Sequence, residues 1–418
     1  MPRPLNNTDT ALNRDNLLPL AQRYNAPFWA YDADIIRQRI SQLQQFDTVR
    51  FAQKACSNIH ILRLMRDAGV KVDSVSLGEV ERALVAGFQP GGDEIVFTAD
   101  LLDHATLARI VELKVPVNAG SIDMLHQLGT ASAGHAVWLR VNPGFGHGHS
   151  QKTNTGGENS KHGIWHDDLP EALAAISQHG LKLVGIHMHI GSGVDYGHLE
   201  QVCDAMVNLV IATGTDIAAI SAGGGLSIPY RYGEEAIDTA HYFGLWNAAR
   251  DRIAAHLGHA VQLEIEPGRF LVAESGVLVS QVCAVKAMGS RHFVLVDAGF
   301  SDLMRPSMYG SYHHISLLAA DGRAVDDNAT IESVVAGPLC ESGDVFTQLE
   351  GGMVAPRALP QAQVGDYLVF HDTGAYGASM SSNYNSRPLI PEVLFEAGKL
   401  REIRRAQTIQ ELLALELR

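Results

Sequence analysis

VRFAQKACSNIHILRLMRDAGVKVDSVS, residues 49–76, contains two short apolar segments on either side of a helix-like segment. The flanking segments, VRFAQKA and VKVDSVS, are rich in β-branched and apolar residues and lead into polar turns, which is typical of buried strands. The segment between them ends in Gly69, as many helices do. The stretch therefore predicts a strand, a helix and a second strand.

The same alternation continues to about residue 270. Eight strand–helix units are the number found in a (β/α)₈ barrel, and continuous apolar strands suit that fold. We favour this TIM-like α/β barrel, and a doubly wound open sheet is the structural alternative. The eight candidate strands are VRFAQKA (49–55), VKVDSVS (70–76), EIVFTAD (94–100), PVNAG (116–120), AVWLRVNP (136–143), LVGIHMHI (183–190), AISAGGG (219–225) and VQLEIEP (261–267).

The pattern changes after residue 270. Runs such as GVLVSQVCAVKAMG (276–289) and DYLVFHDTG (366–374) are typical of strands joined by turns, with few helices between them. We therefore expect a barrel over residues 28–270 and a C-terminal antiparallel β domain over 271–418, joined by residues 1–27. The final TIQELLALEL predicts a short capped helix.

Composition narrows the class of protein. The chain has 418 residues, of which 46% are hydrophobic and 19% charged, as expected for a globular protein of more than one domain. A net charge of −14 without a Lys/Arg run disfavours a nucleic-acid-binding surface. The four cysteines are far apart, the N-terminus is polar and no apolar stretch could span a bilayer. We therefore expect a cytoplasmic protein with reduced thiols.

Unusual residues gather where the predicted strands end, which is the active-site end of a barrel. Lys54 lies near the end of the first strand, and His187 and His189 lie at the end of the sixth. Glycines 223–225 close the seventh strand, and residues 266–269 (EPGR) close the eighth. This convergence indicates a functional site more strongly than any single motif.

Lys54 has two interpretations. Burial disfavours an unpaired ammonium group, so the side chain could reach out of the barrel or pair with Asp73. A desolvated lysine also suits a Schiff base with a carbonyl compound. Together with its neighbours, Lys54 is best interpreted as a Schiff-base lysine.

The glycine run predicts a phosphate site. Three residues without Cβ allow the backbone N–H groups to approach a ligand, and the loops after strands seven and eight commonly hold phosphate in barrels. Ser192 and Arg269 could add a hydroxyl group and a cation. A tight turn without a ligand is the structural alternative.

Glu266 indicates chemistry at a carbon next to nitrogen. Breaking a bond at Cα leaves a carbanion, and a protonated pyridine ring can accept that charge if a carboxylate lies beside the ring nitrogen. Glu266 could instead pair with Arg269. His189 could lie on the face of such a ring, although an isolated histidine is more often an ordinary hydrogen-bonded barrel residue.

The loop PGFGHGHSQKTNTGGENSKHG (143–163) is long and rich in Gly, His and Asn. A mobile lid over the barrel mouth is the favoured interpretation. A metal site at His147 and His149 lacks the carboxylate or cysteine spacing that would support it, so we expect no metal.

These motifs, in this order, resemble the fold-type III, alanine-racemase-like decarboxylases, which are pyridoxal-phosphate enzymes acting on ornithine, arginine or diaminopimelate. The resemblance covers nearly the whole chain and is greatest to the members that act on diaminopimelate. One departure is His162, where many relatives carry Phe; we expect it to alter lid packing and leave the chemistry intact. The matching segments are KA (54–55), HMHIGS (187–192), GGG (223–225), EPGR (266–269), MRPSMY (304–309), GPLCESGD (337–344) and DTGAYGASMSSNYN (372–385).

The resemblance implies a homodimer whose active sites form between subunits. It implies that Lys54 forms the Schiff base with pyridoxal phosphate, that His189 stacks on its ring and that Glu266 pairs with the ring nitrogen. Cys340 of the partner subunit would be the general acid that reprotonates Cα, since a thiol pKa can be tuned toward neutrality. The implied cofactor-binding set is Lys54, Asp73, His189, Ser192, Gly223, Gly224, Gly225, Glu266, Gly268, Arg269 and Tyr376.

Substrate choice follows from charge. Diaminopimelate carries a carboxylate as well as an amine at its far end, and Arg305 with Tyr309 could hold that carboxylate. Glu341 could hold the distal amine, and Arg269 and Tyr376 would also contact the substrate. An ordinary salt bridge is the alternative role of Arg305.

The expected reaction is decarboxylation of meso-diaminopimelate to L-lysine and CO₂. The alternatives are an ornithine, lysine or arginine decarboxylase of the same fold and a non-catalytic pyridoxal-phosphate carrier. The second domain and Cys340 disfavour a carrier. A racemase is disfavoured because the resembling racemases place an arginine against the ring nitrogen, where this chain has Glu266.

Overall fold

The computed structural model describes residues 5, 9–25, 27–146, 156–189, 191 and 195–417. The chain divides into two compact units, which we call the barrel unit and the β unit. The barrel unit contains residues 39–227 and 236–270, and the β unit contains residues 1–38, 228–235 and 271–418.

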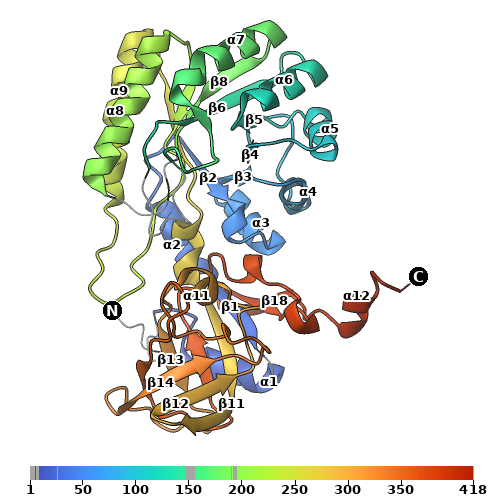
Figure 1. Ribbon diagram of the computed structural model, residues 1–418, viewed down its shortest axis with the longest axis vertical. Helices are drawn as coiled ribbons and strands as arrows, with labels where there is room; N and C mark the ends of the chain where they lie inside the picture. Colours follow the sequence, from blue (N-terminus) through green and yellow to red (C-terminus); the bar gives the residue numbers. More distant parts are fainter. Residues whose placement is uncertain are drawn as a thin grey trace. The chain divides into compact units, whose positions relative to one another are not determined.

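The barrel unit is built on eight parallel strands that close into a (β/α)₈ barrel (Figure 1). The last strand, β10, pairs with the first, β2, so that Glu264 lies beside Thr48. The eight strands overlap the eight predicted segments, which confirms the barrel and excludes the open sheet. They are β2 (Thr48–Ala52), β3 (Lys71–Ser74), β4 (Ile95–Ala99), β5 (Val117–Ala119), β6 (Ala136–Asn142), β8 (Lys182–His187), β9 (Ala219–Ser221) and β10 (Gln262–Ile265), and the short β7 (Ile164–Trp165) pairs with β6.

Several helices of the barrel unit end at the glycines that the sequence marks as helix ends, among them α4, α7 and α9. The Ser76 side chain accepts the backbone N–H of Glu79 at the start of α4, and Gly87 ends that helix with φ 101°. Only glycine adopts such a positive φ without strain, which explains the recurrent helix-ending glycines. The helices between the strands are α3 (Ile59–Asp67), α4 (Leu77–Ala86), α5 (His104–Leu113), α6 (Ile122–Ala131), α7 (Leu169–His179), and α8 (Tyr196–Thr213) and α9 (Thr239–Leu257), which pack side by side. Helix α2 (Ala33–Ser41) precedes β2 and α10 (Arg269–Val272) follows β10, and each contains a boundary between the ranges of the two units.

A buried ion pair joins the first and last strands of the barrel. Arg50 on β2 donates from Nε to Oε2 of Glu264 on β10 at 2.6 Å, and from Nη2 to Oε1 at 3.1 Å. Their side chains are only 2% and 4% exposed. Burial alone would lower the pKa of Arg50, but the Glu264 carboxylate outweighs burial and raises it. The two charges are therefore tolerated only as a pair.

Removing one partner of this pair should destabilise the barrel. In Glu264→Leu the Arg50 charge stays buried without its carboxylate, and we expect a loss of roughly 3–5 kcal/mol in the free energy of unfolding. Urea unfolding followed by circular dichroism measures this loss. The double variant Arg50→Met, Glu264→Leu should recover most of it, since apolar side chains of similar volume often replace a buried pair without loss. Equal losses in the single and double variants would contradict the argument.

The β unit contains a mixed sheet of nine strands among its described residues. Most neighbouring strands are antiparallel, as expected for the C-terminal domain, but β1–β17 and β12–β14 are parallel pairs. The strands are β1 (Phe28–Asp32), β11 (Gly276–Met288), β12 (Arg291–Val296), β13 (Ile315–Leu318), β14 (Thr330–Ala336), β15 (Arg357–Pro360), β16 (Tyr367–Phe370), β17 (Glu392–Glu396) and β18 (Lys399–Arg404).

Strand β1 differs from the expected start of the barrel at residue 28. Phe28 pairs with Val279 on β11, and Trp29 pairs with Glu392 on β17, so β1 lies in the sheet of the β unit. The barrel unit begins only at Arg39. An apolar strand such as FWAYD is equally suited to either sheet, and its pattern does not specify which one it joins.

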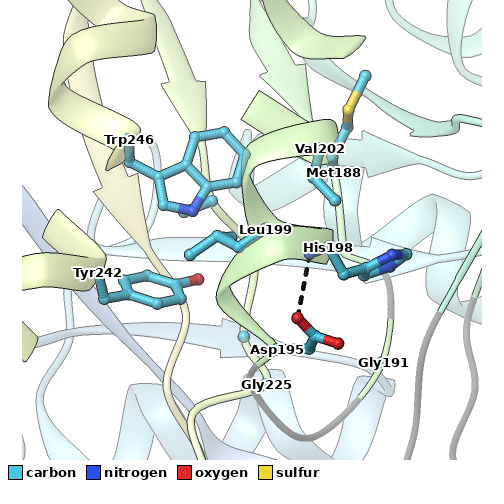
Figure 2. A pocket seen from close by; sticks show the side chains of 11 residues that line it. Met188, Gly191, Asp195, His198, Leu199, Val202, Gly225, Tyr242 and Trp246 are labelled. Atoms are coloured by element: carbon cyan, nitrogen blue, oxygen red, sulfur yellow. Dashed lines mark hydrogen bonds between the residues drawn. The ribbon is translucent and has the colours of Figure 1, made fainter. Parts of the chain in front are cut away.

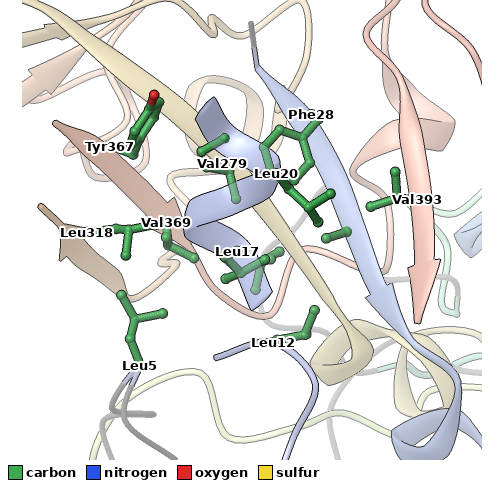
Figure 3. Packing of buried hydrophobic residues seen from close by; sticks show 13 residues of the cluster. Leu5, Leu12, Leu17, Leu20, Phe28, Val279, Leu318, Tyr367, Val369 and Val393 are labelled. Carbon is green, nitrogen blue, oxygen red and sulfur yellow. The ribbon is translucent and has the colours of Figure 1, made fainter. Parts of the chain in front are cut away.

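Helix α1 (Arg14–Tyr24) packs on this sheet. Its Leu17 and Leu20 belong to one buried cluster with Phe28, Val279 and Val369 (Figure 3). The described part of the N-terminal segment is therefore part of the β-unit core. The other helices of this unit are α11 (Arg305–Tyr309) and α12 (Ile409–Leu413).

The predicted C-terminal helix is confirmed. Thr408 and Glu411 form a capping box at the start of α12, in which each side chain accepts a backbone N–H of the other. Across the described ranges, no helix is both long and apolar enough to cross a membrane.

Candidate active site

The candidate residues of the barrel unit lie where its strands end, as predicted. Asp73 lies on β3, His189 follows β8 and Glu266 follows β10 directly. Lys54 lies in the 3₁₀ turn Gln53–Ala55 directly after β2. Its side chain is exposed and not buried within a strand as expected, because the turn carries it past the end of β2. The amine is therefore accessible to a ligand.

Glu266 is held by two hydrogen bonds inside the barrel. Nε2 of His187 lies 2.7 Å from Oε2, and the Ser221 hydroxyl donates to Oε1 at 3.0 Å. Burial alone would raise the pKa of Glu266, but His187 outweighs it, with help from Arg50 and Ser221, and the pKa is lowered. The carboxylate is thus kept ionised, and since an ionised carboxylate only accepts, His187 is the donor.

Asp73 has the opposite environment. It is buried, and its Oδ1 has no hydrogen-bond partner among the described residues. Burial and the like charge of Glu266 raise the pKa of Asp73, against a hydrogen bond from Thr98 and the charge of Lys54. Two neighbouring carboxyl groups whose pKa values shift in opposite directions are typical of catalytic sites.

His189 is held in one orientation and one protonation state. The Gly224 N–H donates to its Nδ1 at 3.2 Å, so the ring carries its proton on Nε2. Burial lowers the pKa of His189 well below its ordinary value, and the cations Arg140 and Lys54 lower it further. The site therefore presents a neutral imidazole ring.

The glycine run is required by the surrounding backbone. A Cβ on Gly224 would lie 2.6 Å from the Glu266 carbonyl oxygen, and Gly223 and Gly225 have φ values of 62° and 108°. The N–H of Gly223 is donated to the Ser221 hydroxyl oxygen at 3.1 Å. The Gly223 N–H thus positions Ser221, which holds Glu266, and the Gly224 N–H holds His189 directly. Gly225 remains as the candidate for phosphate binding. Gly268 lies close to β2, where a Cβ would meet the Ala52 carbonyl oxygen at 3.2 Å.

Sequence reasoning missed three residues of this site. The sequence pattern places His187 at a strand end without assigning it a role, and it does not distinguish Ser221 or Arg140 from their neighbours. Arg140 lies buried on β6, where burial lowers its pKa and nearby carboxylates, Asp100 first among them, oppose that shift. A lone arginine inside the apolar run AVWLRVNP is the signal that could have revealed it, since a buried guanidinium needs carboxylate partners.

A small cavity lies beside the glycine run (Figure 2). Its volume is about 20 Å³, room for about one water molecule, so it cannot hold a pyridine ring. Asp195, at its edge, accepts the His198 N–H at 3.2 Å and caps α8. The cavity is lined by Met188, Gly191, Asp195, His198, Leu199, Val202, Ala222, Gly224, Gly225, Tyr242 and Trp246.

His162, the departure from the family pattern, is bound to the barrel. Its Nδ1 lies 2.5 Å from Oδ2 of Asp100, whose Oδ1 accepts the Gly163 N–H at 3.1 Å. Burial would raise the pKa of Asp100, but these hydrogen bonds outweigh it and lower the pKa. A polar contact therefore holds this position.

Some predictions fall on residues outside the described ranges. Ser192, His147 and His149 are among them, as is part of the predicted lid. Within the described ranges, no group of three or more His, Cys, Asp or Glu side chains could hold a metal ion.

Cys340 and Glu341 lie on a loop of the β unit that Asp344 organises. Oδ2 of Asp344 accepts the Leu339 N–H at 2.8 Å, and its Oδ1 accepts a second backbone N–H at 2.7 Å. The Cys340 N–H donates to Oδ1 of Asn385 at 2.9 Å. Both Cys340 and Glu341 are exposed, so the loop presents a thiol and a carboxylate side by side.

Arg305, Tyr309 and Tyr376 also lie in the β unit. Arg305 and Tyr309 occupy the two ends of α11, and Arg305 is buried. Tyr376 has φ 57°, a conformation that residues other than glycine rarely adopt. It is followed by Gly377, where a Cβ would lie 2.4 Å from the Thr373 carbonyl oxygen. A strained tyrosine held by so tight a turn is a candidate functional residue.

Comparison with known proteins identifies the family. Residues 32–273 match the family described as pyridoxal-dependent decarboxylase, pyridoxal binding domain. The diaminopimelate decarboxylase of Escherichia coli strain K12 is 73% identical, with 100% of both chains covered. That of Streptomyces coelicolor is 64% identical over 97% of this chain and 93% of the relative. This chain belongs to the diaminopimelate decarboxylase family.

Solved structures agree with this assignment to the diaminopimelate decarboxylase family. A crystal structure of a diaminopimelate decarboxylase has a TM-score of 0.97 and 73% identity, covering 100% of this chain and 99% of that one. The Helicobacter pylori diaminopimelate decarboxylase complexed with L-lysine has a TM-score of 0.84 and 31% identity, covering 96% and 99%. The two-part fold is therefore that of the family.

The barrel site fits pyridoxal phosphate, the cofactor that defines this family of decarboxylases. An ionised Glu266 can accept a hydrogen bond from a protonated ring nitrogen, and the neutral His189 ring can stack on an aromatic face. The exposed amine of Lys54 can reach an aldehyde. Asp73 Oδ1 is a buried acceptor with no hydrogen-bond partner among the described residues, as expected where a ligand completes a site.

The raised pKa of Asp73 predicts a pH-dependent gain in stability for Asp73→Asn. In the folded protein the ionised form is disfavoured by burial and by Glu266, so it destabilises the fold once the pH exceeds about 4, the ordinary aspartate pKa. The gain should therefore be absent near pH 4, increase with pH and level off above the raised pKa. Urea unfolding of the cofactor-free protein at pH 4.5 and pH 8, relative to wild type, measures it. A gain of equal size at both pH values would show that charge is not its cause.

Proposed function

We propose that this chain decarboxylates meso-2,6-diaminopimelate to L-lysine and CO₂, the reaction that completes lysine biosynthesis. The observation that carries the proposal is 73% identity over the full length to a diaminopimelate decarboxylase. The gathering of Lys54, His189 and Glu266 at one end of the barrel supports it.

Pyridoxal phosphate, when bound, supplies a ring that accepts the electron pair left at Cα as CO₂ departs. Lys54 would hold the cofactor through its side-chain amine. Glu266, which His187 and Ser221 hold ionised, would favour the protonated form of the ring nitrogen. The neutral His189 ring would hold the aromatic face of the cofactor.

The phosphate is assigned to the glycine turn and its surroundings. Gly225, Ser192 and Arg269 are the groups that we propose to hold it, with Tyr376 at the phosphate or the adjacent substrate carboxylate. Arg269 is the first residue of α10 and supplies a cation.

Cys340 is proposed as the group that returns a proton to Cα. Its exposed side chain and the fixed backbone of its loop support a role toward a ligand. We propose a homodimer in which Cys340 of the partner subunit completes each site, with Glu341 beside it to bind the distal amine. The four cysteines are free, which supports our placing the enzyme in the reducing cytoplasm.

The distal carboxylate separates the proposed substrate from ornithine, lysine and arginine. Those amino acids end in a cation alone, and their pockets need carboxylates. Arg305 and Tyr309 on α11 instead offer a buried guanidinium and a phenol. A CO₂-release assay with all four amino acids distinguishes this function from that of the related decarboxylases and from a carrier.

Arg305→Ala should reduce kcat/KM for meso-diaminopimelate by about 100-fold or more, because each charged hydrogen bond to the distal carboxylate contributes about 1.5–3 kcal/mol. Arg305→Lys should fall between this variant and wild type, since it keeps the charge but loses the two-donor fork. Steady-state kinetics measures both. Unchanged turnover in Arg305→Ala would refute the assignment.

A complementation experiment tests the shared active site. Lys54→Ala and Cys340→Ala should each be inactive alone, and Lys54→Ala should lose covalently attached cofactor in the mass spectrum. Random mixing should restore about one quarter of wild-type activity, because half of the dimers are mixed and each mixed dimer has one complete site. A purified mixed dimer without activity would place both residues in the same subunit's site.

A further inference from the structure

We propose that Tyr230 and His313 are positioning residues that orient Arg305 toward a substrate carboxylate and thereby determine substrate specificity. This inference rests on the proposed function, in which Arg305 binds the distal carboxylate. All three residues belong to the β unit, so their contacts lie within one compact body.

Two acceptors hold one edge of the Arg305 guanidinium. Nη1 lies 2.9 Å from Nε2 of His313 and donates to the Tyr230 hydroxyl oxygen at 3.2 Å. Its Cζ also lies 5.0 Å from the centre of the Tyr230 ring, within cation–π range. Arg305 is only 5% exposed, so the low dielectric around it strengthens these contacts.

The tautomer of His313 is fixed by its other nitrogen. Nδ1 lies 2.9 Å from the His371 carbonyl oxygen, which can only accept, so Nδ1 carries the proton. Nε2 is then an acceptor and receives the N–H of Arg305. A chain of two hydrogen bonds thus connects the backbone of residue 371 to the guanidinium, and it requires a neutral His313.

The two contacts orient the guanidinium without neutralising it. The Tyr230 hydroxyl and the neutral His313 ring carry no charge, and they occupy both hydrogens of Nη1. A guanidinium held in one orientation can bind a carboxylate through a two-donor fork. Holding that fork before binding reduces the entropy lost on binding.

Two further cations, Arg357 and Arg231, lie over the ring of Tyr312, the residue before His313. Arg357 donates from Nη1 to the His313 carbonyl oxygen at 2.6 Å, and its Cζ lies 4.2 Å from the Tyr312 ring centre. Arg231 lies over the same ring at 4.3 Å. Burial lowers the pKa of Arg357 to about 10, and the charge of Arg231 adds a smaller contribution in the same direction. Such a cluster favours a substrate with a distal carboxylate over one ending in an amine alone.

Tyr230 comes from an unexpected part of the chain. Residues 228–235 follow the glycine turn of the barrel by only a few positions, yet they belong to the β unit. One connection therefore supplies both the proposed phosphate turn and a residue that holds Arg305.

Product inhibition tests the proposal on the intact holoenzyme. L-Lysine retains the carboxylate that was distal in meso-diaminopimelate, whereas 1,5-diaminopentane is the same molecule without it. His313→Leu should raise the inhibition constant of L-lysine about tenfold and leave that of 1,5-diaminopentane unchanged, because only the carboxylate contact is lost. The KM for meso-diaminopimelate should rise in parallel, with kcat largely kept.

Conservative variants separate orientation from folding. His313→Gln places an amide oxygen near the position of Nε2 and should recover most of the L-lysine affinity. Tyr230→Phe keeps the ring and loses one acceptor, so a smaller rise is expected. The matched control is His314→Leu, which changes the adjacent histidine. His314 is partly buried, and its ring lies against that of His371. This variant should bind both inhibitors as wild type does.

Each other outcome has a distinct meaning. If Arg305→Ala weakens L-lysine binding but His313→Leu and Tyr230→Phe do not, the positioning role is wrong and the proposed function stands. If Arg305→Ala leaves L-lysine binding unchanged, the carboxylate assignment within the proposed function fails. An equal loss for both inhibitors in His313→Leu would indicate general damage and overturn the inference.

Discussion

The hydrogen bond between His187 and Glu266 is the interaction on which the barrel site depends. Burial alone would raise the pKa of Glu266, and a protonated Glu266 could not serve the role that we propose for it beside a ring nitrogen. His187 from β8 and Ser221 from β9 each donate a hydrogen bond to one oxygen of the Glu266 carboxylate. Three neighbouring strands must therefore be in register for Glu266 to stay ionised. Closure of the barrel between β10 and β2, with its Arg50–Glu264 pair, maintains that register.

The same charge explains the state of the neighbouring groups. With Glu266 ionised, a second negative charge on Asp73 is disfavoured, and the pKa of Asp73 is raised. His189 receives an N–H from Gly224 and stays neutral, although carboxylates lie nearby, because burial and two cations act against its protonation. One site therefore contains an anion, a neutral imidazole and a carboxyl group with a raised pKa, which is the separation of roles that proton chemistry at Cα needs.

Periodicity predicted the barrel because each strand is a short apolar run before a helix. The places of Lys54 and Glu266 where strands end were predictable too, because charged residues next to apolar runs are rare. Contacts between strands were not predictable. The segment HMHIGS does not indicate which of its histidines bonds to Glu266. The hydrogen bonds that the glycine N–H groups donate to Ser221 and His189 form only in the folded barrel. The place of β1 was missed for the same reason, since a fully buried strand fits either sheet.

In the β unit, a sequence motif identifies a residue but not the contacts that orient it. MRPSMY identifies Arg305, but not that a neutral His313 and Tyr230, the latter far away in sequence, hold its guanidinium. A flexible surface arginine loses much rotamer freedom when it binds a carboxylate, whereas a buried, doubly held one has already lost it on folding. If Arg305 binds the distal carboxylate as we propose, specificity becomes a property of the fold, because the guanidinium is oriented before the substrate arrives.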